Sequence, residues 1–121
     1  MNNKLTPQQI KIIKDKETEA PFSGKYVDHK EDGTYTCAQC NTPLFSSTTK
    51  FDSGSGWPSF YDVVEQGNVD LEKDNSGGME RVEVVCKTCK GHLGHLFDDG
   101  PSDKGGKRYC INSASLDFKN K

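Results

Sequence analysis

Four of the five cysteines in this 121-residue chain form two Cys-x-x-Cys pairs. Each pair follows a short β-type run and precedes turn residues, so each could form a knuckle whose two thiolates face one ion. Two knuckles supply four thiolate ligands, the donor set of a structural zinc site that leaves no position open for water or substrate. The spacing therefore predicts one zinc ion bound by Cys37, Cys40, Cys86 and Cys89.

Paired cysteines have two other uses. A redox dithiol is typical of a βαβ context, and this sequence shows no βαβ pattern. A disulfide staple is disfavoured in the cytoplasm, where we expect this chain to reside. Zinc is the preferred interpretation, and its binding could contribute on the order of 10 kcal/mol to folding.

The fifth cysteine, Cys110, lies in a strand-like run at 107–113. Strand alternation places Arg108, Cys110 and Asn112 on one polar face and Tyr109 on the other. A guanidinium beside a thiol favours the thiolate, which is the nucleophilic form. The alternative is a small buried cysteine that only fills space, and the polar face argues against it. Cys110 is therefore a candidate nucleophile.

Two histidines, His92 and His95, follow the second cysteine pair closely. Histidine is the usual partner of a catalytic thiol, as acid, base or orienting group. A solvated loop histidine and an additional metal ligand remain open as alternatives. The third histidine, His29, lies in a charged stretch and is expected at the surface.

The single tryptophan, Trp57, lies in a glycine-rich bend at 54–60. A lone tryptophan is more often a core residue. Glycines before it and a proline after it indicate a loop instead, and an indole on a loop could form one wall of a small apolar pocket. The motif alone leaves both interpretations open.

The elements that must position these residues are mostly short strands. Runs at 34–37, 81–86 and 108–112 are β-type, and Gly, Ser, Asp and Pro recur between them. They predict a mainly β fold of antiparallel sheet. Stretches 75–78 and 102–106 are predicted to be exposed turns.

The N-terminus predicts a helical extension. Thr6 and Gln9 have the spacing of a capping box, with Pro7 at the first helical position. Ile10 and Ile13 are predicted to form the face that packs on the domain.

Composition limits the remaining possibilities. Only 31% of the residues are hydrophobic, which predicts a small core that a metal would stabilise, in one domain of residues 1–121 with its core at about 5–118. The net charge of −2 disfavours a nucleic-acid partner. No apolar run could span a membrane, and no apolar segment of a secretory signal is present, so we expect a cytoplasmic protein.

These motifs together resemble the methionine sulfoxide reductase B family, the peptide-methionine (R)-S-oxide reductases. The matching stretches are 21–24, 44–45, 51–60, 91–101 and 108–113, in the family's order and with both knuckles, so the resemblance runs from about Leu5 to Phe118. It implies two antiparallel sheets packed as an open barrel, with the zinc site away from the catalytic face.

The resemblance also implies roles for individual residues. The nucleophile falls on Cys110, and the catalytic imidazoles fall on His95 and His92. Asn112 matches a hydrogen-bonding asparagine of the site. The implied substrate-binding residues are Trp57, which would hold the substrate methyl group, Arg108 beside the nucleophile, and Phe97 in the pocket wall.

One departure concerns recycling. Many family members carry a second, resolving cysteine where this chain has Ser55. The resemblance therefore implies a one-cysteine enzyme, in which the Cys110 thiolate attacks the sulfoxide and becomes a sulfenic acid. An external thiol, such as a thioredoxin- or glutaredoxin-like protein, would then reduce it.

The expected function is repair of oxidised proteins by reduction of the R epimer of methionine sulfoxide, as part of the oxidative stress response and by a monomer. A zinc-ribbon binding module is the rival from another class, but it leaves Cys110, the histidine pair and Trp57 unexplained. A zinc-stabilised thiol peroxidase or redox sensor that uses Cys110 alone is a third possibility.

Overall fold

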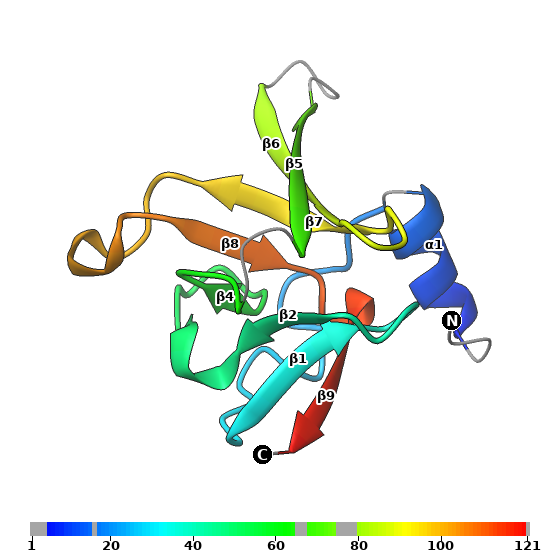
Figure 1. Cartoon of the computed structure of the whole chain (residues 1–121), viewed down its shortest axis with the longest axis horizontal. Coiled ribbons are helices and arrows are strands. Elements are labelled where there is room, and N and C mark those ends of the chain that lie inside the picture. Colours follow the sequence, from blue (N-terminus) through cyan, green and yellow to red (C-terminus); the bar gives the residue numbers. More distant parts are fainter. Residues whose placement is uncertain (1–4, 16, 65–67, 75–79, 121) are drawn as a thin grey trace.

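The computed structural model describes residues 5–15, 17–64, 68–74 and 80–120, so the predicted turn at 75–78 lies outside the described residues. This part of the chain contains one α-helix, α1 (Pro7–Asp15), and nine strands (Figure 1). The strands are β1 (Gly33–Cys37), β2 (Pro43–Ser46), β3 (Lys50–Phe51), β4 (Ser59–Phe60), β5 (Val69–Asp74), β6 (Arg81–Cys86), β7 (His92–Phe97), β8 (Arg108–Ile111) and β9 (Leu116–Asn120).

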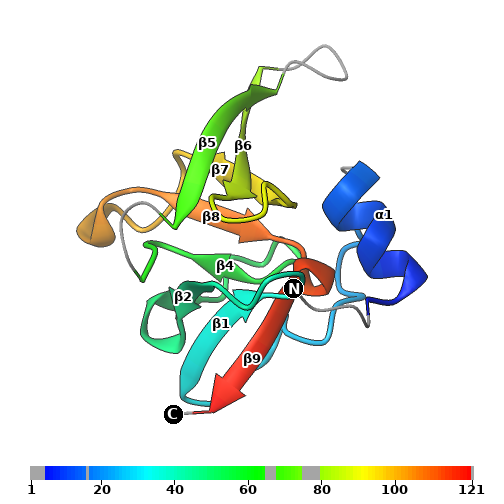
Figure 2. The same cartoon turned by 45° about the vertical axis from the view of Figure 1, so that its right-hand side comes forward.

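The strands form two antiparallel sheets. One has three strands in the order β2-β1-β9, and the other has six in the order β3-β4-β8-β7-β6-β5 (Figure 2). Within the described residues, each sheet keeps two edge strands, so neither is closed into a barrel. The predicted mainly β fold of two antiparallel sheets is confirmed.

Aromatic side chains from both sheets form the centre of the core. Tyr35 and Phe45 come from the three-stranded sheet, and Phe60 and Tyr109 come from the six-stranded sheet. The rings of Phe45 and Phe60 stack at 4.4 Å, and Tyr35 meets Phe60 edge-on at 5.2 Å. The two sheets therefore share one core, and the polar face of β8 is turned away from it.

The N-terminal helix begins as predicted but buries a different face. The Thr6 backbone N–H donates to Gln9 Oε1 at 2.8 Å, and the Gln9 N–H donates to Thr6 Oγ1 at 3.2 Å, so the capping box is present. The helix packs on β7 and on the 3-10 turn η4 (Ser113–Ser115) through Ile12 and Ile13. Ile10 is 39% exposed, because it lies beyond the edge of that contact stripe.

Two other sequence expectations can be compared with the structure. Residues 102–106 form an exposed turn, with positive φ at Gly105 and Gly106. His29 was expected at the surface but is half-buried, with Nδ1 2.7 Å from the Tyr35 hydroxyl and its ring edge-on to Phe118. Among the described helical residues, no helix is long and apolar enough to cross a membrane.

Candidate functional site

The four paired cysteines converge on one point. Their sulfur atoms all lie within 4.8 Å of one another, with 3.6 Å between Cys37 and Cys89 and 3.5 Å between Cys40 and Cys86. Zn–S bonds of about 2.3 Å in a tetrahedron give sulfur–sulfur edges of about 3.8 Å. The donor set and its dimensions therefore fit a zinc ion.

The two knuckles are built in the same way. Cys37 ends β1 and Cys86 ends β6. The residue after each second cysteine, Asn41 or Lys90, has a left-handed φ, of 65° and 63° respectively, and this turns the chain back. The Asn41 N–H donates to Cys37 O at 2.8 Å, and the Lys90 N–H donates to Cys86 O at 2.7 Å. Since β1 and β6 belong to different sheets, an ion here would join the two sheets.

Cys110 lies apart from this cluster, at a small cavity of about 80 Å³. Its strand neighbours Tyr109 and Ile111 point into the core, so the predicted alternation of faces is confirmed. None of the four knuckle cysteines lines the cavity. The residues that line it are Thr18, Trp57, Arg81, Gly94, His95, Phe97, Cys110 and Asn112.

Strand register places an imidazole beside the thiol. His95 on β7 is paired with Cys110 on β8, and Ser59 on β4 is paired with Cys110 from the other side. Paired residues of antiparallel strands project to the same face. A side chain at Gly94 would collide with the Cys110 carbonyl, so glycine permits the close approach of these two strands.

Both histidines are held by carboxylates of the β5–β6 hairpin. His95 Nε2 lies 2.8 Å from Asp74 Oδ2, and Arg81 approaches the same oxygen at 3.5 Å. His92 Nδ1 lies 2.8 Å from Glu83 Oε2, and both side chains are buried. The two imidazole rings are 5.4 Å apart, and His92 is not among the residues that line the cavity. His92 therefore lies beside His95 but outside the cavity lining.

Sequence reasoning did not identify Asp74 or Glu83. A signal existed for Glu83, because a carboxylate among the valines of 82–85 is unusual in a strand that is otherwise apolar. Asp74 offered no comparable signal, because its contact with His95 depends on the pairing of β5 with β6.

Glu19 is a further residue that the sequence did not reveal. Its backbone carbonyl accepts from Trp57 Nε1 at 3.0 Å, and its backbone N–H donates to Asn112 Oδ1 at 3.1 Å. Its buried carboxylate accepts from the backbone N–H groups of Ser113 and Ala114, at 2.9 and 3.0 Å. One residue thereby fixes the indole and the amide that line the cavity.

The segment that carries Glu19 is docked on the Trp57 loop. The Phe22 N–H donates to Gly56 O at 2.7 Å. Gly56 has a φ of 92°, and a Cβ there would come within 2.7 Å of Pro21 and 2.9 Å of the Phe22 nitrogen. Only glycine combines this backbone conformation with so close an approach.

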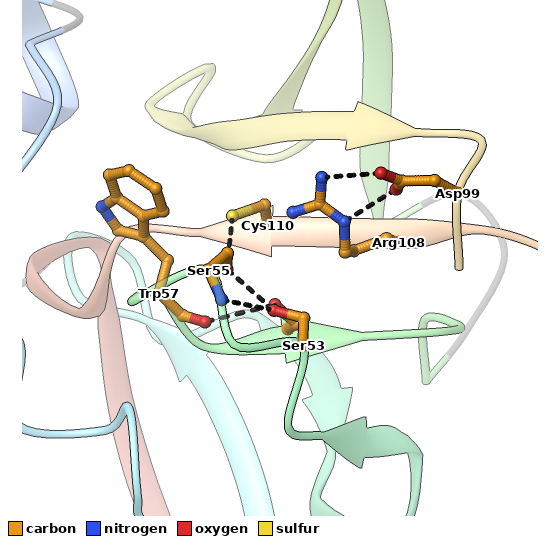
Figure 3. A network of polar contacts seen from close by, with 7 residues as sticks. Ser53, Ser55, Trp57, Asp99, Arg108 and Cys110 are labelled. Atoms are coloured by element: carbon orange, nitrogen blue, oxygen red, sulfur yellow. Dashed lines mark hydrogen bonds and ion pairs between the residues drawn. The ribbon is translucent and has the colours of Figure 1, made fainter. Parts of the chain in front are cut away.

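Arg108 is placed differently from the other predicted residues. Its guanidinium donates to both carboxylate oxygens of Asp99, at 2.8 and 3.3 Å (Figure 3). It also lies 4.4 Å from the Phe97 ring centroid. Phe97 lines the cavity, whereas Arg108 is not among its lining residues. Arg108 therefore packs against the Phe97 ring and places a positive charge near the Cys110 thiol.

Burial raises the pKa of the Cys110 thiol above its ordinary value. The Ser55 hydroxyl, the Arg108 charge and the Ser59 hydroxyl each lower this pKa, but they do not outweigh burial. Burial therefore opposes the ionisation of Cys110 that its neighbour Arg108 would favour. Ser55 Oγ is 3.7 Å from Cys110 Sγ.

The arrangement can perform thiol chemistry on a small group. The cavity presents a sulfur nucleophile, apolar walls from Trp57 and Phe97, and an imidazole on the same face as the sulfur. Such a site suits a short apolar group attached to an electrophilic atom that carries a polar oxygen.

Comparison with known proteins gives consistent matches. Residues 5–120 match the SelR domain family. Peptide methionine sulfoxide reductase MsrB of Methanosarcina barkeri is 58% identical over 115 residues, which cover 95% of this chain and 80% of that protein. The MsrB protein of Leptospira interrogans is 56% identical over 115 residues, covering 95% of this chain and 87% of that protein.

A mammalian protein and a solved structure extend the comparison. Methionine-R-sulfoxide reductase B3, mitochondrial, of Mus musculus is 54% identical over 118 residues, covering 98% of this chain and 46% of that protein. The crystal structure of the Mis18 "Yippee-like" domain superposes with a TM-score of 0.59 at 16% identity, covering 75% of this chain and 98% of that one. At this low identity, the likeness to the Mis18 domain concerns the fold alone.

Proposed function

This chain belongs to the SelR domain family as a peptide methionine sulfoxide reductase, and from that premise we propose that it reduces the R epimer of methionine sulfoxide in oxidised proteins. The observation that carries the proposal is the placement of Cys110, Trp57 and His95 around one small cavity. A zinc-ribbon binding module would have no use for this cavity.

The cavity supports a defined orientation of the substrate. Trp57 and Phe97 offer apolar contact to the sulfur-bound methyl group, while His95 and Asn112 offer polar groups. With the methyl held on one side and the oxygen on the other, only one epimer presents its sulfur to Cys110. We assign the R epimer to this orientation.

The reaction then follows from the chemistry of the thiolate. Cys110 loses its proton and attacks the sulfoxide sulfur, while His95, backed by Asp74 and His92, protonates the sulfoxide oxygen. The S–O bond of the substrate then breaks as its hydroxyl is transferred to Cys110 Sγ. The bond between Sγ and the substrate sulfur breaks as well, so that methionine leaves and Cys110 becomes a sulfenic acid. The sulfoxide is reduced by two electrons to a thioether, and the thiol is oxidised by two.

Recycling is proposed to require an external thiol. The other four cysteines are clustered at the predicted zinc site, and Ser55 offers a hydroxyl that cannot form a disulfide. Two external thiols would convert the sulfenic acid to thiol, with release of water and formation of one disulfide. A thioredoxin- or glutaredoxin-like protein in the cytoplasm is the proposed donor.

The four-cysteine cluster is proposed to hold zinc, which would supply free energy of folding. No step of the reaction needs this ion, because the cavity lies elsewhere and is not lined by its ligands.

A single turnover without reductant tests the proposal. The enzyme is mixed with a peptide that contains either epimer of methionine sulfoxide, in the presence of dimedone, and the products are analysed by mass spectrometry. We expect one methionine per enzyme from the R epimer only, a dimedone adduct on Cys110, and no internal disulfide.

Cys110→Ser should give no methionine while its zinc content and folding match those of the unmutated protein. Equal turnover of both epimers would contradict the stereochemical assignment. A disulfide between Cys110 and a knuckle cysteine, with metal released, would contradict the recycling scheme.

A further inference from the structure

We propose that Ser55 is a catalytic residue that stabilises both ionisation states of Cys110 by reversing its hydroxyl. The hydroxyl accepts a hydrogen bond from the resting thiol and donates one to the thiolate. The inference rests on the proposed function in one respect, namely that Cys110 is the nucleophile.

Ser55 begins a chain of three serine hydroxyls whose last member, Ser59, is paired with Cys110 across β4 and β8. Figure 3 shows the first two, Ser55 and Ser53, beside Cys110. Cys110 Sγ lies 3.7 Å from Ser55 Oγ, and Ser55 Oγ lies 2.7 Å from Ser53 Oγ. Ser53 Oγ lies 2.7 Å from Ser59 Oγ, and the Ser59 hydroxyl donates to the Trp57 carbonyl at 3.1 Å. The chain therefore ends on an atom that can only accept.

This end point fixes the direction of the hydrogen bonds along the chain while the thiol is protonated. The thiol and the three hydroxyls carry one hydrogen each, and there are four contacts to satisfy. Because the Trp57 carbonyl only accepts, all four contacts are made only if Ser59 donates to Trp57, Ser53 to Ser59 and Ser55 to Ser53. Cys110 must then donate its S–H to Ser55.

Loss of the thiol proton requires only one hydroxyl to turn. The Ser55 hydrogen leaves Ser53 and points to the thiolate, while the Ser53 and Ser59 hydrogens keep their partners. Ser53 Oγ still accepts from the Ser55 backbone N–H at 3.3 Å. The nucleophile thus gains a donor, and Ser53 Oγ keeps one.

This donor matters because Cys110 is only 9% exposed and few water molecules can reach its sulfur. Hydrogen bonds to an ionised acceptor are about twice as strong as those between neutral groups. Ser55 should therefore favour the thiolate more than the thiol. The alternative is that the serines only hold the loop at 53–59 in shape, in which case their removal would not change the ionisation of Cys110 in a residue-specific way.

The test measures ionisation directly, without sulfoxide reduction. The rate at which iodoacetamide alkylates Cys110 is followed against pH by mass spectrometry of its peptide, in the zinc-loaded protein. Ser55→Ala should raise the apparent pKa of Cys110 by about one unit, and so slow alkylation at neutral pH about tenfold. Ser55→Thr keeps the hydroxyl and should restore the unmutated profile.

Ser53→Ala separates the proposal from a merely structural role. In Ser53→Ala the Ser55 hydroxyl can no longer donate to Ser53, so this bond no longer competes with its donation to the Cys110 thiolate. The pKa of Cys110 should therefore stay the same or fall. Equal upward shifts in Ser55→Ala and Ser53→Ala, or an unchanged profile in Ser55→Ala with zinc content and unfolding temperature preserved, would overturn the proposal.

Methionine production is measured on unalkylated protein from the same preparations. This measurement separates the role of Ser55 from the proposed reductase function. If the unmutated enzyme fails to reduce the sulfoxide, the proposed function fails, whereas the alkylation profiles still decide the role of Ser55.

Discussion

The carboxylate behind each histidine determines what that histidine can do. Asp74 holds Nε2 of His95, and Glu83 holds Nδ1 of His92, each at 2.8 Å. A carboxylate that engages one ring nitrogen sets the orientation of the imidazole. The proposed acid is therefore a pair of residues, His95 and Asp74, rather than one histidine.

Substitutions at these two positions should give graded losses. His95→Asn should slow the single-turnover formation of methionine about a hundredfold, because a positioned acid is lost. Asp74→Asn should slow it by less, about tenfold, because the imidazole remains but its partner is neutral. Quenched-flow measurement of methionine formation checks both values.

Asp70→Asn is the control for Asp74, since Asp70 lies on the same strand in a more exposed ion pair with Lys90. It should retain the unmutated rate. Full activity in both His95→Asn and Asp74→Asn would show that another group delivers the proton.

At the scale of elements, the segment at 17–24 acts as a strap across the site. It carries no regular strand or helix, yet Glu19 connects the Trp57 loop to the end of β8 through four hydrogen bonds. Two of these bonds involve the carboxylate, which is buried and accepts from two backbone N–H groups. The shape of the cavity therefore depends on an element that contributes little to the sheets.

Glu19→Gln should loosen this strap. An amide nitrogen would face one of the two backbone N–H donors, so one buried donor would lose its acceptor at a cost of about 1–3 kcal/mol in the free energy of unfolding. Trp57 is the only tryptophan, so its fluorescence reports on this site alone. We expect a red-shifted emission and a higher KM, with zinc content unchanged.

Glu17→Gln changes an exposed carboxylate two residues away and serves as the matched control. It should leave emission and KM unchanged. The same emission spectrum in Glu19→Gln and in the unmutated protein would refute a positioning role for Glu19.

At the scale of the molecule, the four cysteines join the two sheets. One knuckle begins at the end of β1 in the three-stranded sheet. The other begins at the end of β6 in the six-stranded sheet and forms the turn into β7. Since β7 carries both His92 and His95, metal binding is expected to help hold these histidines in place, although the metal ligands do not line the cavity.

Cys86→Ser should therefore remove both metal and stability. Metal binding contributes on the order of 10 kcal/mol to the folding of small zinc domains, which exceeds what a small core can replace. Elemental analysis and thermal unfolding should show a metal-free chain that unfolds at a much lower temperature. Cys110→Ser should keep its zinc and its unfolding temperature, and a well-folded, metal-free unmutated protein would rule out the zinc site.

Several features could be predicted from the sequence because each depends on residues close together in the chain. The capping box joins Thr6 and Gln9, the knuckles join cysteines three apart, and the two faces of β8 follow from alternation alone. The family motifs added the grouping of Cys110, His95 and Trp57, and the structure places all three at one cavity.

The tertiary structure decided the partners of those residues and the ionisation of the thiol. Glu19 and Asn112 are 93 positions apart, and Asp74 reaches His95 only through the pairing of β5 with β6 and β6 with β7. The packing of Ile12 instead of Ile10 likewise depends on where β7 meets the helix. Local sequence placed a cation beside Cys110, but burial raises the pKa of this thiol more than Arg108 lowers it, because desolvation depends on every element that covers the sulfur.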